Sequence, residues 1–387
     1  MSRSIITGID IGTYNVKVVI TNGTQKILGM GIAESRGLRH GYIVNLPDVA
    51  MSIKYALADA EKKAGVKVKK AFVAIGGIGL GSIVSTSSVI ISRADLEITA
   101  LDIKKVTEQC EKDIPSSSIL NKKIINSVPL SYKIDGKVAL GKPEGMKGSR
   151  LEVKMLYITC LEHHLNDIIQ AVEEAGVSVE DVVAAPIAAS LITLSKTQKI
   201  AGCILANIGA ETVSIAVFEN NVPVSLEIFP IGSTDITNDI ALGLKVPLEE
   251  AEQIKIGAIT GSSYPRKKLE EIISARLSDI FELIEAHLKK IGRNGLLPAG
   301  IIITGGGSGL NNIEDMAKVA LRLPSRIGSV NLGGDEKRSF RDSTWAVAYG
   351  LCILGTHTDE DKPIDTSNLF FVKMWKAIVS WVKQFLP

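Results

Sequence analysis

Short apolar runs alternate with longer amphipathic stretches along most of this chain. Residues 5–20 contain two apolar runs separated by a polar turn, which predicts two strands joined by a tight hairpin. Residues 46–65 and 267–290 instead carry apolar side chains at helical spacing, which predicts amphipathic helices. A chain that alternates strands with such helices is expected to adopt an α/β fold.

The turn of the first hairpin has the chemistry of a phosphate-binding loop. Gly12 has no Cβ, so the backbone there can approach a ligand closely. Successive amide N–H groups in such a turn form an anion site. Asp10 precedes the turn, and a carboxylate beside phosphate is useful when Mg²⁺ accompanies the phosphate. Taken alone, the stretch is better explained as an ordinary β-hairpin.

The same pattern returns in the second half of the chain. Residues 204–219 again give strand, turn and strand, with Asn207 and Gly209 at the positions of Asp10 and Gly12. Such an internal repeat predicts two related halves. A third element, residues 301–313, combines a strand, a Gly-Gly-Gly turn and a predicted helix start. The three elements resemble the two phosphate motifs and the adenosine motif of the actin/Hsp70 ATPase superfamily.

A more specific resemblance lies between these elements. Residues 127–136 (SVPLSYKIDG) and 142–153 (KPEGMKGSRLEV) resemble the inserted subdomain of the FtsA family, the actin-like bacterial cell-division proteins. The matching positions are Pro129, Asp135, Gly136, Pro143, Gly145, Met146, Gly148 and Leu151, with Glu97, Ile98, Thr99 and Asp102 upstream. Within this subdomain the pattern predicts strands at 124–131, 132–137 and 151–159 and helices at 100–113 and 161–175.

The resemblance implies an actin-like (ribonuclease H-like) two-lobed ATPase fold. The first lobe would comprise residues 1–81 and 166–199, with the inserted subdomain at 82–165. The second lobe would comprise residues 200–233 and 299–355, with an outer subdomain at 234–298. Residues 356–368 would form a linker, and residues 369–387 a C-terminal amphipathic helix.

The same resemblance implies that ATP binds with Mg²⁺ between the lobes. Asp10 would hold the metal through water, Lys17 would reach the phosphates, and Glu252 and Lys255 would face the ribose and base. The alternative for Glu252 and Lys255 is a pair of solvated charges on a helix surface. The residues expected to line the nucleotide are Gly12, Thr13, Tyr14, Asn15, Lys17, Asn207, Gly209, Ala210, Glu211, Thr212, Glu252, Lys255, Gly305, Gly306 and Gly307.

Departures from the superfamily pattern argue against rapid catalysis. Asn207 replaces the usual aspartate of the second hairpin, and Ala210-Glu211 replace the usual Gly-Gly. Ala185 stands where actin-like ATPases of the MreB type carry a water-activating glutamate. Loss of such a base lowers a rate by about 10²–10⁴-fold. The sequence therefore predicts nucleotide binding with slow or absent turnover, and no catalytic residue is assigned.

Composition argues against several other classes of protein. The 387 residues carry a net charge of +2, which gives no general footprint for nucleic acid. The four cysteines have no metal-binding spacing and are predicted to be reduced, buried thiols. The first residues contain no apolar signal region, and no stretch reaches the ~20 apolar residues that span a bilayer.

The C-terminal segment predicts a membrane contact. Residues 356–368 are polar, acidic and contain proline, which is typical of an extended linker. Residues 369–387 then form an amphipathic pattern expected to lie in a membrane interface, as the terminal helix of the FtsA family does. The apolar face would carry Phe371, Met374, Trp375, Ile378, Trp381, Val382 and Phe385, and Lys373, Lys376 and Lys383 would face lipid head groups. A helix docked on its own protein is the alternative.

Together these features predict an adaptor at the cytoplasmic face of the cell membrane, at the division site. Its expected partners are the C-terminal peptide of FtsZ (the tubulin-like division protein), further copies of itself in a protofilament, an anionic membrane surface, and other division proteins through the inserted subdomain. Residues 234–298 would receive the FtsZ peptide, near a basic surface formed by Arg266, Lys267, Lys268 and Arg276.

Two alternative functions stay open. A PilM-like pilus-assembly adaptor shares the nucleotide fold and the inserted subdomain but lacks a terminal membrane helix. A small-molecule kinase would need a catalytic aspartate in the cleft, for which Asp10 is the one candidate in the sequence. A chaperone of the Hsp70 type would need a further substrate-binding domain.

Overall fold

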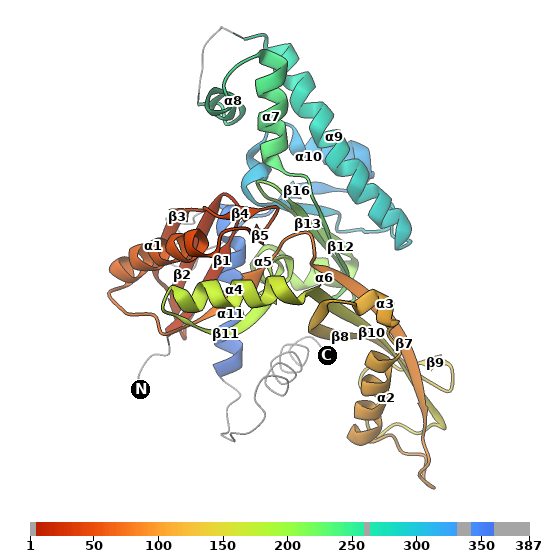
Figure 1. Cartoon of the computed structure of the whole chain (residues 1–387). Helices are drawn as coiled ribbons and strands as arrows, with labels where there is room; N and C mark the ends of the chain where they lie inside the picture. The colour runs from red at the N-terminus through yellow and green to blue at the C-terminus, as the bar shows by residue number, and fades with distance from the viewer. Residues whose placement is uncertain (1–4, 259–263, 331–341, 360–387) are drawn as a thin grey trace.

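The computed structural model describes residues 5–258, 264–330 and 342–359, which form two lobes and an inserted subdomain (Figure 1). The first lobe contains β1 (Ile5–Ile11), β2 (Asn15–Asn22), β3 (Ile27–Glu34), β4 (Leu38–Arg39), β5 (Tyr42–Ile43), α1 (Leu46–Ala64), β6 (Lys70–Ile75), α4 (Glu162–Glu174), β11 (Ser178–Ala184) and α5 (Ala185–Thr193). The inserted subdomain contains β7 (Gly81–Ile90), α2 (Ala100–Lys112), α3 (Ser116–Ile119), β8 (Lys122–Ile134), β9 (Lys137–Val138) and β10 (Arg150–Leu161). The second lobe contains α6 (Lys196–Ala201), β12 (Cys203–Ile208), β13 (Val213–Glu219), β14 (Val222–Phe229), α7 (Ser233–Leu244), α8 (Leu248–Lys255), α9 (Arg266–Lys290), β15 (Ile301–Thr304), η1 (Gly306–Gly309), α10 (Ile313–Leu321) and β16 (Ser325–Ile327), followed by η3 (Ser343–Trp345) and α11 (Ala346–Asp359).

The two lobes have sheets of the same connectivity. The first sheet has the order β11-β6-β1-β2-β3 and the second the order β16-β15-β12-β13-β14. In each, three consecutive strands pair antiparallel, and two later strands add in parallel beside the first of them. This shared order confirms the internal repeat that the two hairpins predict.

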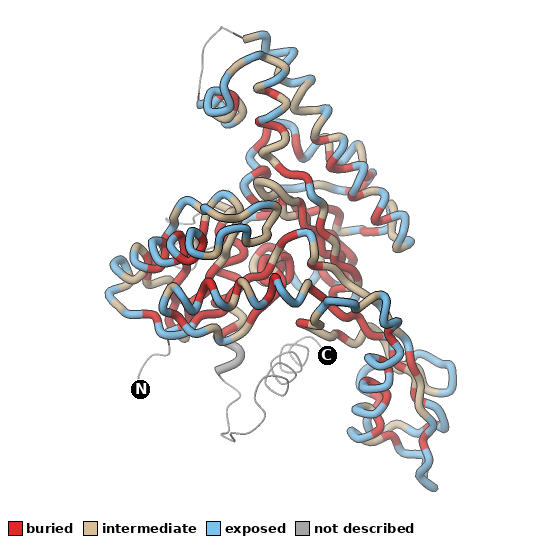
Figure 2. Tube along the Cα trace, viewed as in Figure 1, coloured by how far each residue is buried: buried red, intermediate tan, exposed pale blue. Residues whose placement is uncertain are grey.

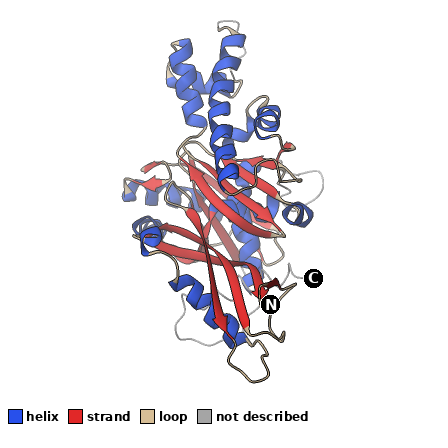
Figure 3. Cartoon of the chain, turned by 90° about the vertical axis from the view of Figure 1, so that its right-hand side faces the viewer, coloured by secondary structure: helices blue, strands red, loops and turns tan. Residues whose placement is uncertain are grey.

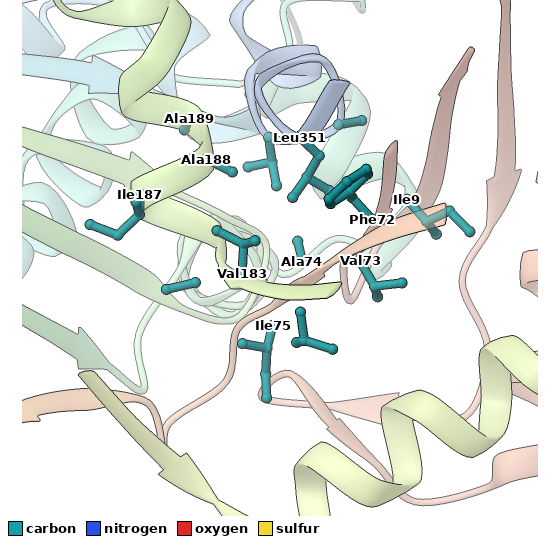
Figure 4. Close-up of a cluster of buried hydrophobic side chains, with 14 of the residues drawn as sticks. Ile9, Phe72, Val73, Ala74, Ile75, Val183, Ile187, Ala188, Ala189 and Leu351 are labelled. Atoms are coloured by element: carbon teal, nitrogen blue, oxygen red, sulfur yellow. The ribbon is translucent and has the colours of Figure 1, made fainter. Parts of the chain in front are cut away.

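Two apolar helices, α5 and α11, pack on each other and join the lobes. Most of their described residues, and most of those of the central strands, are buried, as the red trace in Figure 2 shows. Figure 4 shows Leu351 of α11 near Phe72 and Ile9 of the first sheet, and Ala188 and Ala189 of α5 nearby. Parallel strands covered in this way carry nearly continuous apolar runs, which is why β6 reads AFVAI after its first residue.

Close approach of α5 and α11 depends on Gly350. A Cβ added at Gly350 would lie 2.0 Å from the carbonyl oxygen of Ala188. Because that neighbour is backbone, the helices would have to move apart to accept a side chain. The contact therefore fixes how the two lobes meet.

We expect Gly350→Ala to lower the free energy of unfolding by about 1–3 kcal/mol, because overpacking a fixed backbone contact costs this much. Urea unfolding followed by circular dichroism measures the change. Gly76→Ala is the matched control, since a Cβ at Gly76 meets no atom within 4 Å. Equal stability of the two variants would contradict this account of the α5–α11 contact.

One strand prediction for the inserted subdomain was wrong. Residues 124–131 and 132–137 were predicted as two strands, but Lys122–Ile134 is one strand, β8, followed by the short β9. Pro129 within it pairs with Met155 of β10 at a register shift between Lys154 and Met155. Such a bulge accommodates a residue that lacks an N–H, so proline does not end the strand.

α7 begins at Ser233, because the Asp235 side chain accepts a hydrogen bond from the Gly232 N–H (2.8 Å) and caps the helix. Two element boundaries differ from prediction. The glycine turn leads into the 3₁₀ turn η1, and the α-helix α10 starts only at Ile313. α11 continues to Asp359, into the range 356–368 predicted as a linker.

The outer helices α7, α8 and α9 extend from the second lobe, and the long strands of the inserted sheet extend from the opposite end of the molecule (Figure 3). In the ranges described, no helix is both long and apolar enough to cross a bilayer. The predicted membrane helix, residues 369–387, lies outside the described residues.

Candidate functional site

The two predicted phosphate turns have the same geometry. The Gly12 N–H donates to the Asn15 carbonyl (3.2 Å), and the Gly209 N–H donates to the Thr212 carbonyl (2.9 Å). A Cβ added at either glycine would lie 3.0 Å from that same carbonyl oxygen. In both turns a side chain would crowd the bend, so glycine suits a backbone that must curl around an anion.

Asp10 and Lys17 face each other at the base of the first turn. They are directly paired in the register of β1 and β2. Burial raises the pKa of Asp10 to about 6, while the nearby Lys17 ammonium acts in the opposite direction. Burial also lowers the pKa of Lys17, with the charges of Asp10 and Asp342 opposing the shift. A partly buried carboxyl of raised pKa gains from a bound cation, which favours its charged form.

The Lys17 side chain extends to a segment that sequence reasoning did not select. Its Nζ donates to the Thr344 carbonyl (2.8 Å) and lies 5.6 Å from the centroid of the Trp345 ring. Asp342 shapes this segment, since its Oδ1 accepts from the Thr344 N–H (2.9 Å). The Asp-Ser-Thr run before an apolar helix is an N-cap pattern that could have indicated the segment.

The glycine turn lies directly against the second hairpin. Gly305 has φ +88°, and a Cβ there would lie 2.3 Å from Asn207 Oδ1 and 2.5 Å from the Ile208 carbonyl oxygen. Ser308 Oγ donates to the Gly305 carbonyl (2.7 Å) and lies 3.0 Å from Ser343 Oγ. Hydrogen bonds and packing contacts therefore connect the second hairpin, the glycine turn and the segment that Lys17 reaches.

The start of α7 supports the second turn from behind. The Ser233 N–H donates to the Gly209 carbonyl (2.9 Å) and the Thr234 N–H to the Ala210 carbonyl (2.8 Å). A Cβ at Gly232 would lie 2.2 Å from that Ala210 oxygen. The first residues of α7 therefore hold the turn in place. The Gly209 and Ala210 carbonyl groups of the turn already accept hydrogen bonds from this helix.

Glu252 and Lys255 are not a pair of freely solvated charges. Lys255 Nζ lies 2.7 Å from Glu252 Oε2, and it donates to Thr237 Oγ1 (2.8 Å) and to the Ser233 carbonyl (3.1 Å). Thr237 Oγ1 in turn donates to Glu252 Oε2 (2.6 Å). This network ties α8 to the first turns of α7, the same turns that support Gly209. Their contact with ribose and base stays a prediction.

Glu211 bridges the two lobes, which the sequence did not suggest. Its Oε2 accepts a hydrogen bond from the His40 backbone N–H, and its carbonyl oxygen lies 3.3 Å from His40 Nδ1. His40 follows the short strand β4 of the first lobe and has φ +48°. Because Glu211 occupies a position usually held by glycine, this bridge comes from a departure in the chain's own sequence.

The remaining predicted residues occupy different surroundings. Thr13 and Thr212 lie on the two turns, whereas Tyr14 is largely exposed at 65%. Ala185 begins α5, and its methyl group cannot act as a base. Across the part of the chain that the structure describes, no three His, Cys, Asp or Glu side chains gather to hold a metal.

The residues fit a nucleotide with a metal ion. Gly306 borders open space, since a Cβ there meets no atom within 4 Å, so a flat base or sugar could approach the backbone. The turn amides of Gly12 and Gly209 suit phosphate oxygens, and Asp10 would suit a hydrated divalent ion that offsets phosphate charge.

One residue of the predicted basic surface on α9, Arg276, is paired with carboxylates. Arg276 binds both carboxylate oxygens of Asp239 on α7, at 2.7 and 3.0 Å, and it also pairs with Asp279. The guanidinium is therefore neutralised and serves to join α9 to α7.

A groove of about 520 Å³ lies between α9 and α10. Its apolar floor is flanked by carboxylates, and Val319 stands 79% exposed at its side. The lining residues are Ser278, Phe281, Glu282, Glu285, Asp315, Met316, Val319 and Ala320. The groove is thus acidic and apolar, in contrast to the basic surface expected on this subdomain.

Comparison with known proteins points to one family. Residues 204–350 match the family model "Cell division protein FtsA", and residues 79–159 match "SHS2 domain inserted in FTSA". The chain is 30% identical over 384 residues to the cell division protein FtsA of Borreliella burgdorferi, covering 91% of each chain. It is 29% identical over 386 residues to that of Pseudomonas aeruginosa, covering 93% of this chain and 91% of the relative.

Solved structures share the fold. A PilM-PilN type IV pilus biogenesis complex matches with a TM-score of 0.67 at 19% identity, covering 92% of this chain and 99% of that one. MreB5 of Spiroplasma citri, solved bound to ADP, matches with a TM-score of 0.55 at 13% identity, covering 93% and 99%. The chain thus has the two-lobed actin-like α/β fold with an inserted SHS2 subdomain.

Proposed function

Because the chain belongs to the FtsA family of cell division proteins, we propose that it is an ATP-binding adaptor that tethers FtsZ filaments to the inner face of the cytoplasmic membrane. The observation that carries the nucleotide part is the pair of identical glycine turns, one in each lobe. The pilus-adaptor alternative has no separate support, since a likeness at 19% identity speaks for the fold alone.

In this proposal ATP lies between the two turns. The amides of Gly12 and Gly209 would hold phosphate oxygens, and Mg²⁺ would be held through water by Asp10. Lys17 would add a positive charge, and the backbone of residues 305–307 would accept the adenosine. The bound metal ion would neutralise phosphate charge. With Ala185 in place of a base, turnover would be slow or absent.

The lobes would respond to nucleotide through contacts that cross between them. Lys17 of the first sheet holds the Thr344 carbonyl ahead of α11, and Glu211 of the second lobe holds His40 of the first. A ligand that binds one arrangement of these contacts better than another shifts the population toward it. Self-association into a protofilament would then depend on nucleotide.

The C-terminal peptide of FtsZ is proposed to bind in the groove between α9 and α10. An apolar floor that includes Phe281 and Met316 suits an apolar anchor residue, and the flanking Glu282, Glu285 and Asp315 suit basic residues beside it. Membrane attachment is assigned to residues 369–387 and contact with other division proteins to the inserted subdomain.

We expect Val319→Lys to weaken binding of a labelled FtsZ C-terminal peptide at least tenfold, because a charged side chain would enter an apolar groove. Fluorescence anisotropy with the full chain measures the dissociation constant. Leu242→Lys on α7 is the matched control, since Leu242 is also 79% exposed but lies outside the groove. Unchanged binding by Val319→Lys, or equal loss in both variants, would remove the groove from the proposal.

A further inference from the structure

β7 forms one edge of the inserted sheet. The strand order is β7-β10-β8-β9, so β7 pairs with β10 on one side, over all ten of its residues. Among the described residues, no strand pairs with its other side. An edge strand directs alternate backbone N–H and C=O groups away from its sheet, where they can pair with another chain.

At three other edge strands, β3, β14 and β16, backbone groups already hold hydrogen bonds. At β3, Asp59 Oδ2 accepts from the Ile32 N–H (3.4 Å) and Lys63 Nζ donates to the Met30 carbonyl (3.0 Å). Both side chains come from α1, so that helix covers the outward backbone groups of the strand. Pairing of a further strand at β3 would break these bonds.

The second lobe's edges are blocked as well. At β14, the Leu226 N–H donates to Ser82 Oγ (2.8 Å), and Ser82 Oγ donates to the Leu226 carbonyl (3.0 Å). β14 also contains Pro223 beside a register shift. β16 has three residues, and Glu314 accepts a hydrogen bond from its Ile327 N–H.

Within the ranges that the structure describes, only Ser82 of β7 takes part in such hydrogen bonds, through its side-chain contact with Leu226 of β14. Its sequence, GSIVSTSSVI, contains no charged residue and no proline, and its pairing with β10 has no register shift. Proteins usually interrupt an exposed edge with charges, proline or a bulge because a bare edge attracts other strands. Eight regular residues, 83–90, thus remain open to pairing.

The face of β7 that α2 covers is self-complementary about Thr86. On the face covered by α2, Ser85 Oγ donates to the Cys110 carbonyl (3.0 Å) and Ser87 Oγ to Asp113 Oδ2 (2.7 Å). Ile83 and Val89, on the same face, pack against the core beneath α2. An antiparallel copy centred on Thr86 would place Ile83 opposite Val89 and Ser85 opposite Ser87. On the face under α2, apolar residues thus pair with apolar ones and hydroxyls with hydroxyls. On the other face Thr86 would meet Thr86, and Val84 would meet Ser88.

The two α2 helices of such a pair of chains would pack beside each other without a clash. α2 lies over β7 and β10. Neighbouring strands are about 4.8 Å apart, so a two-fold axis at the β7 edge would bring the two α2 helices to about 10 Å. This is the usual distance between packed helices.

We propose that two copies of this chain associate through β7, antiparallel, to form one continuous sheet with four strands from each copy. The contact is isologous, since the same edge serves both partners. It goes beyond the proposed function, because it involves neither the nucleotide site nor residues 369–387.

Sedimentation equilibrium of the full chain without lipid tests this interface. We expect Thr86→Lys to raise the dimer dissociation constant at least tenfold, because like charges would then face each other across the two-fold axis. Thr86→Val, which keeps the branched shape without charge, should stay within threefold of the native chain. A monomeric native chain at 100 µM, or unchanged association of Thr86→Lys, would overturn the proposal.

Cross-linking tests the register independently. Thr86→Cys should form an intermolecular disulfide when a mild oxidant is added, because directly opposite Cβ atoms lie about 5 Å apart. The four native cysteines are buried, so they give little background. Val84→Cys alone should not cross-link, since Ser88 of the other copy would face it. Cross-linking of Val84→Cys but not Thr86→Cys would overturn this pairing. It would also be overturned if the chain did not self-associate and a peptide of another division protein protected the β7 amides from hydrogen exchange. Calorimetry with ATP on the same variants distinguishes failure of this interface from failure of the nucleotide site.

Discussion

Replacing Gly306 with valine is expected to weaken ATP binding at least 100-fold while leaving the fold intact. A side chain at Gly306 meets no protein atom within 4 Å, so the chain can accept it. It would instead occupy the open space in which the proposed nucleotide lies against the backbone. A 100-fold change corresponds to about 2.7 kcal/mol of binding free energy.

Isothermal titration calorimetry with Mg²⁺ measures this effect, and the native chain should bind ATP stoichiometrically at micromolar levels. Gly81→Val is the matched control, because a Cβ at Gly81 also meets no atom within 4 Å and Gly81 lies in the inserted subdomain. Both variants should unfold at the temperature of the native chain. Absence of ATP binding by the native chain would contradict the proposed site, and full binding by Gly306→Val would displace the adenosine from this turn.

Removing residues 360–387 is expected to abolish co-sedimentation with anionic vesicles and to leave ATP binding unchanged. The cut follows α11, which continues to Asp359. The removed segment includes Trp375 and Trp381, which the sequence places on a predicted apolar face, and three lysines, each of which would add about 1 kcal/mol on an anionic leaflet. This expectation rests on sequence, since the segment lies outside the described residues.

Two further variants separate the contributions to membrane binding. Trp375→Glu with Trp381→Glu should abolish sedimentation as the truncation does, because carboxylates would enter the apolar face. Lys373, Lys376 and Lys383 replaced by glutamine should weaken binding only partly, and the remaining binding should no longer depend on salt. Equal sedimentation of the truncated and full chains would show that membrane attachment lies elsewhere or does not occur.

The glycine turns, the repeat and the family could be predicted from sequence. Gly12 and Gly209 each stand between two apolar runs, and a tight turn is decided by the few residues that form it. The break predicted within β8 was wrong because the prediction used local sequence alone. Proline argues against a strand locally, but the register shift beside Pro129 depends on the partner strand β10.

The contacts of Glu211 and Arg276 followed from no local pattern. Glu211 reads as an extra side chain near the phosphates, whereas in the structure it holds the His40 backbone of the other lobe. Arg276 reads as part of a basic surface, whereas Asp239 neutralises it. In both cases the partner is distant in sequence, so its identity depends on how whole elements pack.

By itself, the sequence predicted the two glycine turns, the internal repeat and an amphipathic pattern at residues 369–387, of which the last stays a prediction. Periodicity and turn chemistry act over a few residues and need no partner to be recognised. Only the tertiary structure decided that Lys17 donates to a carbonyl 327 residues away, at Thr344, and that β7 keeps an open edge while α1 covers β3. Those features arise because the packing of both lobes on α5 and α11, and of each helix on its sheet, brings distant segments into contact.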